Sequence, residues 1–349
     1  MKCVVLTGGG TAGHCTPNIA LIPHLKNYFD KIIYVGSYEG IEKDLAVKNN
    51  LEYFPISCVK LKRDKILSNI SIPIKLSKAI KEAKYTLKLI KPNVIFSKGG
   101  YVSLPVVIAG KMLKIPVISH ESDLTVGLSN KIASHFSKST LTSFPETAKS
   151  IKRGIYVGPP LGCISPCKIN SLDSKILNFT PNKPIIFITG GSQGSRTINN
   201  VIINSLNLIL DKFCVIHQCG KNNLSNITLK DYYQCEFISD MQSIYKLCSV
   251  CVARAGSNTV FELISNNVPT IFIPLPKGAS RGDQILNAKY FNKKGLCQIL
   301  EQENLSPKSL YEQIIKTYEK RSQLISLMQK EKVVDSCPLI AEIISKNAL

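Results

Sequence analysis

The sequence has no tryptophan, few acidic residues and no long hydrophobic run. No apolar segment approaches the roughly 18 residues that a membrane-spanning helix needs, which argues against an integral membrane protein. A single lysine precedes the first apolar residues, which is too little for a secretory signal, so we expect a cytoplasmic protein. The 12 cysteines form no dense framework, and we therefore expect reduced thiols.

Acidic residues are scarce because 44 Lys and Arg stand against 24 Asp and Glu, a formal net charge of +20. This balance indicates an anionic partner: nucleic acid, a membrane surface or a phosphorylated substrate. The alternative is a lysine-rich composition spread evenly over the surface. A nucleic-acid-binding protein is disfavoured, because the chain lacks interleaved aromatic and basic residues and a recognisable binding module.

Ten of the basic residues lie in residues 60–91, against two acidic ones. From Pro73 on, the pattern predicts an amphipathic helix, with apolar residues on one side at Leu76, Ile80, Ala83, Leu87 and Ile90. A basic stripe runs beside them, formed by Lys78, Lys81, Lys84, Lys88 and Lys91. A basic amphipathic helix is typical of membrane-surface binding, and Leu76, Ile80 and Leu87 would then insert unless that side packs on the core. A core-facing helix with a solvated lysine face is the equal alternative.

Apolar strand-like runs alternate with helical stretches along the whole chain. The runs are residues 2–7, 32–36, 94–97, 116–119, 184–189, 213–218, 249–253 and 270–274. This alternation predicts an α/β fold with doubly wound parallel sheets. Two of the runs lead directly into glycine-rich turns, at residues 8–13 and 190–195, which predicts two nucleotide-fold domains facing a cleft. Backbone amides at such turns bind phosphate or other anions.

The first turn, Gly8-x-Gly10-x-x-Gly13, matches the dinucleotide fingerprint, but the second strand ends in Gly36-Ser37 without an acidic residue. NAD binding therefore lacks its second requirement. We expect His14 in the first turn of the following helix, where the dipole favours a neutral imidazole that accepts a proton. The alternative is a histidine that only caps or packs.

Polar residues follow two further strands. His120 to Asp123 fall at the carboxyl end of a strand, where ligands of open α/β sheets bind, although Asp123 alone is also a possible helix cap. Arg254 to Glu262 form a third strand-to-helix turn suited to a diphosphate. For Glu262, binding of ribose hydroxyls competes with a capping box, Thr259-x-x-Glu262.

Taken together, these segments resemble the MurG family, the N-acetylglucosaminyltransferases that convert lipid I to lipid II in peptidoglycan synthesis. The matching stretches, in family order, are GGGTAGHCTPN (8–18), GGYVSLP (99–105), IPVISHES (115–122), GGSQGS (190–195), HQCGK (217–221), RAGSNTVFE (254–262), IPLP (273–276) and DQILNA (283–288). The resemblance implies the GT-B architecture of two Rossmann-like domains. The N-terminal domain would comprise residues 1–160, with helix 338–349 packing back on it. The C-terminal domain, which would bind UDP-GlcNAc, would comprise residues 161–337.

The resemblance also implies site residues. The UDP-GlcNAc site would consist of Thr11, Ala12, Gly13, Ser192, Ile238, Ser257, Asn258, Thr259, Val260, Phe261, Glu262 and Gln284. Within it, Ser192 would bind the α-phosphate, the Ile238 backbone would meet uracil, and Glu262 would take the ribose. Gln284, with Asn287, would bind the GlcNAc hydroxyls. His14 would be the catalytic base, with Asp123 as the other candidate.

Two departures from the family stand out. The family reads HEQN where this chain has Asp123 in place of the asparagine, and GNPVR where it has Gly162 in place of the arginine. A further negative charge near a diphosphate is unfavourable unless it is protonated or paired.

The resemblance implies an inverting transfer to lipid I at the cytoplasmic face of the bacterial membrane, by a peripheral protein bound to anionic lipid. We expect no metal and no cofactor, because amide dipoles take up the leaving-group charge. A hydrolysing UDP-GlcNAc 2-epimerase shares this fold and is the alternative.

Overall fold

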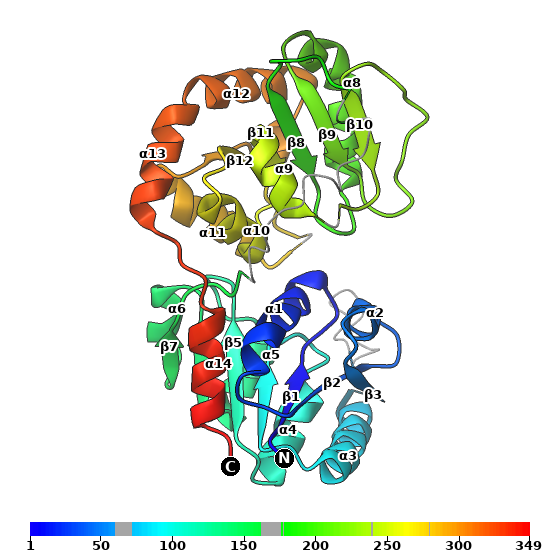
Figure 1. The fold of residues 1–349 in the computed structure, drawn as a ribbon, viewed down its shortest axis with the longest axis vertical. Coiled ribbons are helices and arrows are strands. Elements are labelled where there is room, and N and C mark those ends of the chain that lie inside the picture. Colours follow the sequence, from blue (N-terminus) through cyan, green and yellow to red (C-terminus); the bar gives the residue numbers. More distant parts are fainter. Residues whose placement is uncertain (60–71, 162–175, 177, 239, 279) are drawn as a thin grey trace. The chain divides into compact units, whose positions relative to one another are not determined.

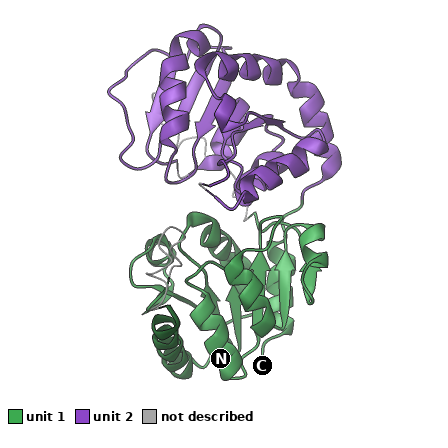
Figure 2. Cartoon of the chain, turned by 180° about the vertical axis from the view of Figure 1, so that it is seen from behind, with its two compact units in different colours: residues 1–163, 334–349 green, residues 164–333 purple. Residues whose placement is uncertain are grey.

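The computed structural model describes residues 1–59, 72–161, 176, 178–238, 240–278 and 280–349. The chain divides into two compact units (Figures 1 and 2). Unit 1 comprises Met1–Cys163 and Val334–Leu349, and unit 2 comprises Ile164–Val333. Both are parallel sheets covered by helices, which is the α/β class that the alternating pattern predicts.

Unit 1 contains a seven-stranded sheet in the order β3-β2-β1-β4-β5-β6-β7. Its strands are β1 (Cys3–Thr7), β2 (Lys31–Ser37), β3 (Glu52–Ile56), β4 (Val94–Ser97), β5 (Val117–Glu121), β6 (Ser139–Thr142) and β7 (Gly154–Tyr156). Its helices are η1 (Ala12–His14), α1 (Thr16–Leu25), α2 (Ile41–Lys48), α3 (Ile72–Ile90), α4 (Leu104–Met112), α5 (Leu128–Phe136), α6 (Pro145–Lys149) and α14 (Cys337–Lys346). All neighbouring strands pair in parallel.

Both faces of this sheet are buried. Successive side chains of a strand point to opposite sides, so neighbouring residues belong to different core clusters. Val4 and Leu6 of β1 belong to the core cluster that includes α1 and α14. Val5, between them, belongs to the opposite cluster, which includes Leu87 of α3 and Ala133 of α5. The sheet is therefore covered by helices on both sides, as in a doubly wound fold.

The last helix returns to unit 1. Ile340 and Ile344 of α14 are fully buried in the cluster that also contains Leu21 of α1. The side-chain amide of Asn93, just before β4, donates to the Leu349 carbonyl at 2.8 Å. Unit 1 is thus built from both ends of the chain.

Unit 2 contains a six-stranded parallel sheet in the order β10-β9-β8-β11-β12-β13. Its strands are β8 (Ile185–Thr189), β9 (Cys214–Gln218), β10 (Tyr232–Cys235), β11 (Cys248–Ala253), β12 (Thr270–Phe272) and β13 (Gln298–Ile299). Its helices are α8 (Arg196–Lys212), α9 (Met241–Leu247), α10 (Ser257–Ser265), α11 (Asp283–Lys293), η4 (Gln302–Asn304), α12 (Pro307–Glu319) and α13 (Arg321–Glu331). One core cluster joins strands β8, β9, β11 and β12 to α8 and α12.

The strand orders fix where a ligand meets each sheet. In unit 1 the order reverses between β1 and β4, and in unit 2 it reverses between β8 and β11. Open α/β sheets bind ligands at such a switch point, outside the carboxyl ends of the strands. Each glycine-rich turn follows β1 or β8, so the fold places both turns at these points.

Helix α3 forms as predicted, and for Leu87 and Ile80 the alternative of an apolar side packed on the core is the one found. Leu87 is buried and Ile80 packs partly against the same core cluster, so the apolar side faces the sheet. The exposed apolar residues are instead Ile74, Tyr85 and Leu89, at 76%, 66% and 59% exposure. Residues 60–71, with four of the ten basic residues, lie outside the described part of the chain.

No helix in the described ranges is both long and apolar enough to cross a bilayer. The ten cysteines within those ranges are free, as the sequence predicts.

Candidate functional site

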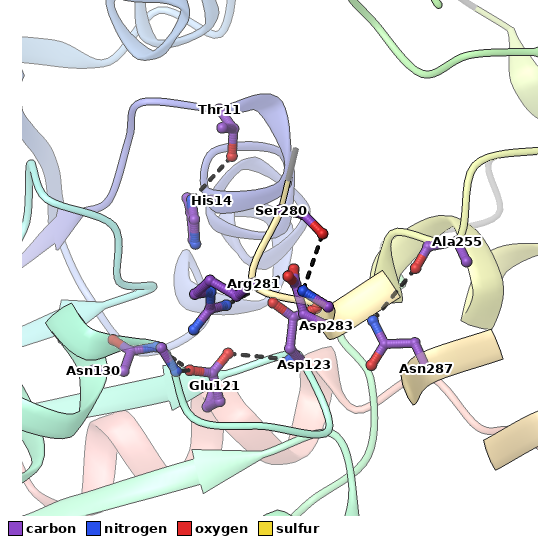
Figure 3. Close-up of polar contacts among 12 residues, drawn as sticks. Thr11, His14, Glu121, Asp123, Asn130, Ala255, Ser280, Arg281, Asp283 and Asn287 are labelled. Atoms are coloured by element: carbon purple, nitrogen blue, oxygen red, sulfur yellow. Dashed lines mark hydrogen bonds and ion pairs between the residues drawn. The ribbon is translucent and has the colours of Figure 1, made fainter. Parts of the chain in front are cut away.

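The first glycine-rich turn leads from β1 into the short helix η1. Nδ1 of His14 lies 3.0 Å from the Thr11 hydroxyl, which orients the ring (Figure 3). His14 ends η1, and α1 begins only at Thr16. The prediction that His14 lies in the first turn of the long helix is therefore wrong, because η1 intervenes.

Glu42 lies beneath this turn, and the sequence analysis missed it. The carboxylate is fully buried and accepts hydrogen bonds from the Gly10 N–H at 3.4 Å and the Ser37 N–H at 3.3 Å. It also accepts one from the Ser37 hydroxyl. The acidic residue that the dinucleotide fingerprint requires at the tip of β2 thus follows a few residues later, on α2. It binds the protein's own turn instead of a ribose.

A second glycine turn, Lys98 to Tyr101, follows β4 and packs on the first. A Cβ atom on Gly10 would lie 2.4 Å from the Tyr101 ring, and φ of Gly10 is +87°. A Cβ atom on Gly100 would lie 2.3 Å from the Gly9 carbonyl oxygen and 3.3 Å from Nδ1 of His14. Glycine at these positions allows the two turns to touch, which places Tyr101 and His14 at one edge of the sheet.

The loop after β5 is held by Glu121. Its carboxylate accepts hydrogen bonds from the Asp123 N–H at 3.1 Å, the Gly127 N–H at 2.9 Å and the Asn130 side-chain amide at 3.0 Å (Figure 3). Helix α5 has Gly127 as its N-cap, four residues after Asp123. The interpretation of Asp123 as a helix cap is therefore wrong, and its side chain belongs to the loop at the sheet edge.

In unit 2, the glycine-rich turn at residues 190–195 ends at Ser195, the N-cap of α8. The Ser195 hydroxyl accepts a hydrogen bond from the Ile198 N–H at 3.4 Å. A Cβ atom on Gly194, where φ is +74°, would lie 1.9 Å from the Cys219 carbonyl oxygen. Only glycine fits there. The turn is thereby held against the end of β9, and Ser192 lies within it, partly exposed.

The third turn opens α10. Gly256 is the N-cap and no side chain caps the helix, so the capping box of Thr259 and Glu262 is wrong. The N–H groups of Ser257 to Thr259 stand at the helix start, where an anion finds donors. Val260 and Phe261 are buried behind them.

Glu262 lies in the second turn of α10 and accepts a hydrogen bond from the Tyr245 hydroxyl at 3.1 Å. Burial raises the pKa of its carboxyl to about 7, although the Tyr245 hydrogen bond acts in the opposite direction. A carboxyl with this pKa exchanges its proton near neutral pH, so binding of hydroxyl donors by its ionised form depends on pH.

Arg254, at the end of β11, joins three loops of unit 2. Its guanidinium donates to the Ser195 hydroxyl at 2.8 Å, to the Ile273 carbonyl at 2.9 Å and to the Gln302 side chain at 2.7 Å. Burial lowers the pKa of Arg254 to about 10, which leaves it a cation at neutral pH. Sequence analysis placed Arg254 in the motif but gave it no role.

The remaining predicted residues of unit 2 are partly engaged within the protein. Oε1 of Gln284 accepts a hydrogen bond from the Leu275 N–H at 3.1 Å. Asn287 is fully buried and donates to the Ala255 carbonyl at 3.4 Å (Figure 3). The Ile238 N–H donates to the Gln218 side chain at 3.0 Å.

No group of three or more His, Cys, Asp or Glu side chains able to hold a metal ion occurs among the described residues. Gly162, the second departure from the family, lies outside them.

Comparison with known proteins agrees with this arrangement. The Glycosyltransferase family 28 N-terminal domain matches residues 4–142, and the Glycosyltransferase family 28 C-terminal domain matches residues 185–341. The chain is 43% identical, over 99% of both chains, to the UDP-N-acetylglucosamine–N-acetylmuramyl-(pentapeptide) pyrophosphoryl-undecaprenol N-acetylglucosamine transferase of Clostridium botulinum (strain 657 / Type Ba4). The chain belongs to the MurG family. The same-named enzyme of Clostridium tetani is 42% identical over 99% of this chain and 98% of its own.

Solved structures show the same fold. The crystal structure of Acinetobacter baumannii MurG matches 99% of this chain and 100% of its own, with a TM-score of 0.77 at 25% identity. A UDP-GlcNAc 2-epimerase from Neisseria meningitidis, bound to UDP-GlcNAc, matches 99% of each chain with a TM-score of 0.68 but only 13% identity. The second likeness shows the fold alone. The predicted GT-B architecture and MurG-family membership are therefore confirmed.

Proposed function

We propose that this protein is an inverting N-acetylglucosaminyltransferase of peptidoglycan synthesis. The 4-hydroxyl of MurNAc in undecaprenyl-pyrophosphoryl-MurNAc-pentapeptide attacks C1 of UDP-GlcNAc, which forms the disaccharide and releases UDP. The full-length identity of 43% to enzymes named for this transfer is the observation that supports the proposal most strongly.

Unit 2 binds the donor in this proposal. Ser192 and the helix starts at Ser195 and Ser257 supply hydroxyl and N–H donors for the diphosphate. Glu262, once ionised, accepts hydrogen bonds from the ribose hydroxyls, and the Ile238 carbonyl accepts one from uracil. The amide of Gln284 is left to donate to a GlcNAc hydroxyl, since its oxygen holds Leu275.

In unit 1, His14 takes the proton of the attacking hydroxyl. Its Nδ1 is 3.0 Å from the Thr11 hydroxyl, which fixes the orientation of the ring that accepts the proton. Ala12 and Gly13 form the turn beside it and would contact the donor sugar. Charge on the departing UDP is stabilised by the helix N-termini of unit 2, which act as preorganised dipoles.

Helix α3 supports a peripheral position on the cytoplasmic membrane surface, where a lipid-linked acceptor resides. Lys78, Lys81 and Lys88 are exposed on the same helix as the exposed Ile74 and Leu89. Each basic residue near an anionic surface contributes roughly 1 kcal/mol, so a few suffice for reversible binding.

The deciding experiment incubates the protein with UDP-GlcNAc, with and without a lipid I analogue, and measures UDP and disaccharide. We expect disaccharide, and UDP release that depends on the acceptor. UDP release without acceptor, accompanied by free N-acetylmannosamine, would establish the 2-epimerase instead. Release of neither product would contradict both.

A further inference from the structure

The proposed mechanism gives no role to the HQCGK segment (217–221), although it lies at the end of β9 in the donor-binding unit. Gln218, the last residue of that strand, is only 4% exposed. In the sheet, β9 lies between β8 and β10. The glycine-rich turn at 190–195 follows β8, and the segment 236–238 follows β10. Gln218 is therefore next to both loops.

The oxygen of the Gln218 side chain contacts the segment after β10. Oε1 accepts a hydrogen bond from the Ile238 N–H at 3.0 Å. Ile238 is only partly buried, and its neighbour Phe237 is 63% exposed. The backbone of this segment is thus held, at Ile238, by a buried side chain of the adjacent strand.

The nitrogen of the same side chain contacts the 190–195 turn. Nε2 donates to the Thr189 hydroxyl at 3.2 Å and to the Gly191 carbonyl at 3.4 Å. The Thr189 hydroxyl in turn accepts a hydrogen bond from the Gly191 N–H at 3.1 Å. Both backbone polar groups of Gly191 are therefore bonded to this pair of side chains, directly before Ser192.

One rigid amide group thus joins two loops. Glutamine carries a hydrogen-bond acceptor and two donors in a single plane, and here the acceptor serves one loop and the donors serve the other. Since a buried polar group that loses its partner costs free energy, neither loop moves away from Gln218 without penalty. The amide therefore fixes the spacing between the backbones of Gly191 and Ile238.

The end of β9 is itself firmly held. Nδ1 of His217 lies 3.0 Å from the Tyr232 hydroxyl, and Nε2 lies 3.1 Å from Oδ1 of Asn199. The side-chain amide of Asn199 donates to the Cys219 carbonyl at 2.9 Å, so its oxygen accepts from His217. These buried bonds connect α8, β9 and β10. They give Gln218 a fixed support.

We propose that Gln218 is a positioning residue of the donor site, which sets the spacing between the Ile238 backbone and the turn that carries Ser192. The site then accepts the base and the diphosphate of one nucleotide together. This role rests on the proposed function, in which Ile238 meets uracil and Ser192 the α-phosphate. A ligand that uses both loops gains from their being held in place beforehand, whereas uridine uses only one of them.

Calorimetric titration of the full-length protein with UDP tests this role. Gln218→Met keeps the length of the side chain but removes its hydrogen bonds to both loops. The matched control is Gln234→Met on β10, because the amide of Gln234 is also well bonded, but to Ser225 and Ile227. We expect Gln218→Met to raise the Kd for UDP about tenfold or more, and Gln234→Met to stay within twofold. A merely structural role would lower the Tm of both variants and leave both Kd values unchanged.

Thr189→Val distinguishes the two ends of the link, and it serves as the test if Gln218→Met does not fold. This change removes the hydroxyl between Gln218 and the Gly191 N–H but keeps the bond to Ile238. The Kd for UDP should rise several-fold, on the order of one lost hydrogen bond, while the Kd for uridine stays within twofold. Equal losses for UDP and uridine, or no loss for either, would overturn the proposal.

Amide hydrogen exchange tests the link without any ligand. In Gln218→Met, exchange of the Ile238 and Gly191 N–H groups should be about tenfold faster or more, and in Gln234→Met it should match the wild type. Unchanged exchange at both groups would contradict the link. A wild type that binds neither UDP nor uridine would contradict the proposed donor site, and the exchange rates would still decide whether Gln218 joins the two loops.

Discussion

Among single residues, Glu262 makes the most specific prediction about pH. Its folded-state pKa of about 7 lies above the ordinary value of 4.5, so the folded protein holds an additional proton between these pH values. Folding stability from this group is therefore present at low pH and is lost as pH rises toward 7. Glu262→Gln should raise stability above pH 7, on the order of 1–3 kcal/mol, and leave it unchanged near pH 4.

The same residue should link UDP binding to pH. Ribose hydroxyls donate to the ionised carboxylate, so UDP affinity should fall as pH drops below 7, and Glu262→Gln should bind weakly at every pH. Calorimetric titration between pH 5.5 and 8.5 measures this. An equal UDP affinity of the wild type across this pH range would show that Glu262 does not bind the ribose.

His14 is tested by its effect on turnover. Removing a proton acceptor from the transition state should lower kcat about 100-fold or more in His14→Ala, with a small change in donor KM. His24→Ala, in the last turn of α1, is the control and should retain full turnover. A kcat near that of the wild type in His14→Ala would show that another group acts as the catalytic base.

Glu42 is predicted to hold the first turn in place. In Glu42→Gln, an amide N–H₂ group faces the N–H donors of Gly10 and Ser37, so buried donors lose an acceptor. We expect a loss of about 1–3 kcal/mol in the free energy of unfolding. Glu39→Gln, on the exposed loop before α2, should cost almost nothing. Equal, small effects of both changes would show that the turn holds without Glu42.

The site residues that the sequence predicts lie in the turns after strands, as Ser192 does after β8 and Ser257 after β11. Sequence analysis missed Glu42 and Arg254 as supports, because their partners lie far away in sequence. Arg254 reaches Ser195 across 59 residues, and Glu42 reaches Gly10 across 32. Such contacts depend on strand order, which local patterns do not contain.

At the scale of elements, the predicted strands were those with continuous apolar runs, and they form the middle of each sheet. The missed strands β3, β7, β10 and β13 lie at the edges. Edge strands are exposed and short, and Glu52 and Pro55 of β3 are both exposed. β6 was missed for another reason: it reads Ser-Thr-Leu-Thr, so its buried positions are mostly hydroxyl side chains.

Helix α3 is the element whose predicted role depends on which side faces outward. The replacement of Lys78, Lys81, Lys84 and Lys88 by Gln should weaken binding to anionic vesicles at low salt, because fewer charges attract the surface. Activity on vesicle-borne lipid I should fall with it, while activity on a soluble short-chain acceptor is spared. Co-sedimentation and the two assays measure this.

The apolar part of that contact belongs to the outward residues. Ile74→Ser with Leu89→Ser should weaken vesicle binding at high salt, where charge is screened and insertion remains. Val47→Ser, at 62% exposure on α2, is the control. Loss of activity on both acceptors in the lysine or the apolar variants would assign α3 to the fold and remove it from the membrane contact.

At the scale of the whole molecule, the two units have separate cores, and unit 1 depends on residues from both ends of the chain. Ile340→Ala in α14 creates a cavity in the unit 1 core and should cost about 2–5 kcal/mol. The matched control is Leu339→Ala, because Leu339 directly precedes Ile340 on the same helix but is 44% exposed. UDP should instead stabilise unit 2 by mass action.

Differential scanning calorimetry therefore separates the units. Ile340→Ala should lower the transition of unit 1, and saturating UDP should raise that of unit 2, so that the two perturbations move different parts of the heat-capacity trace. A single transition shifted equally by both would show that the units unfold together. An unchanged trace in Ile340→Ala would mean that α14 adds no stability to the sheet, although Ile340 is fully buried against it.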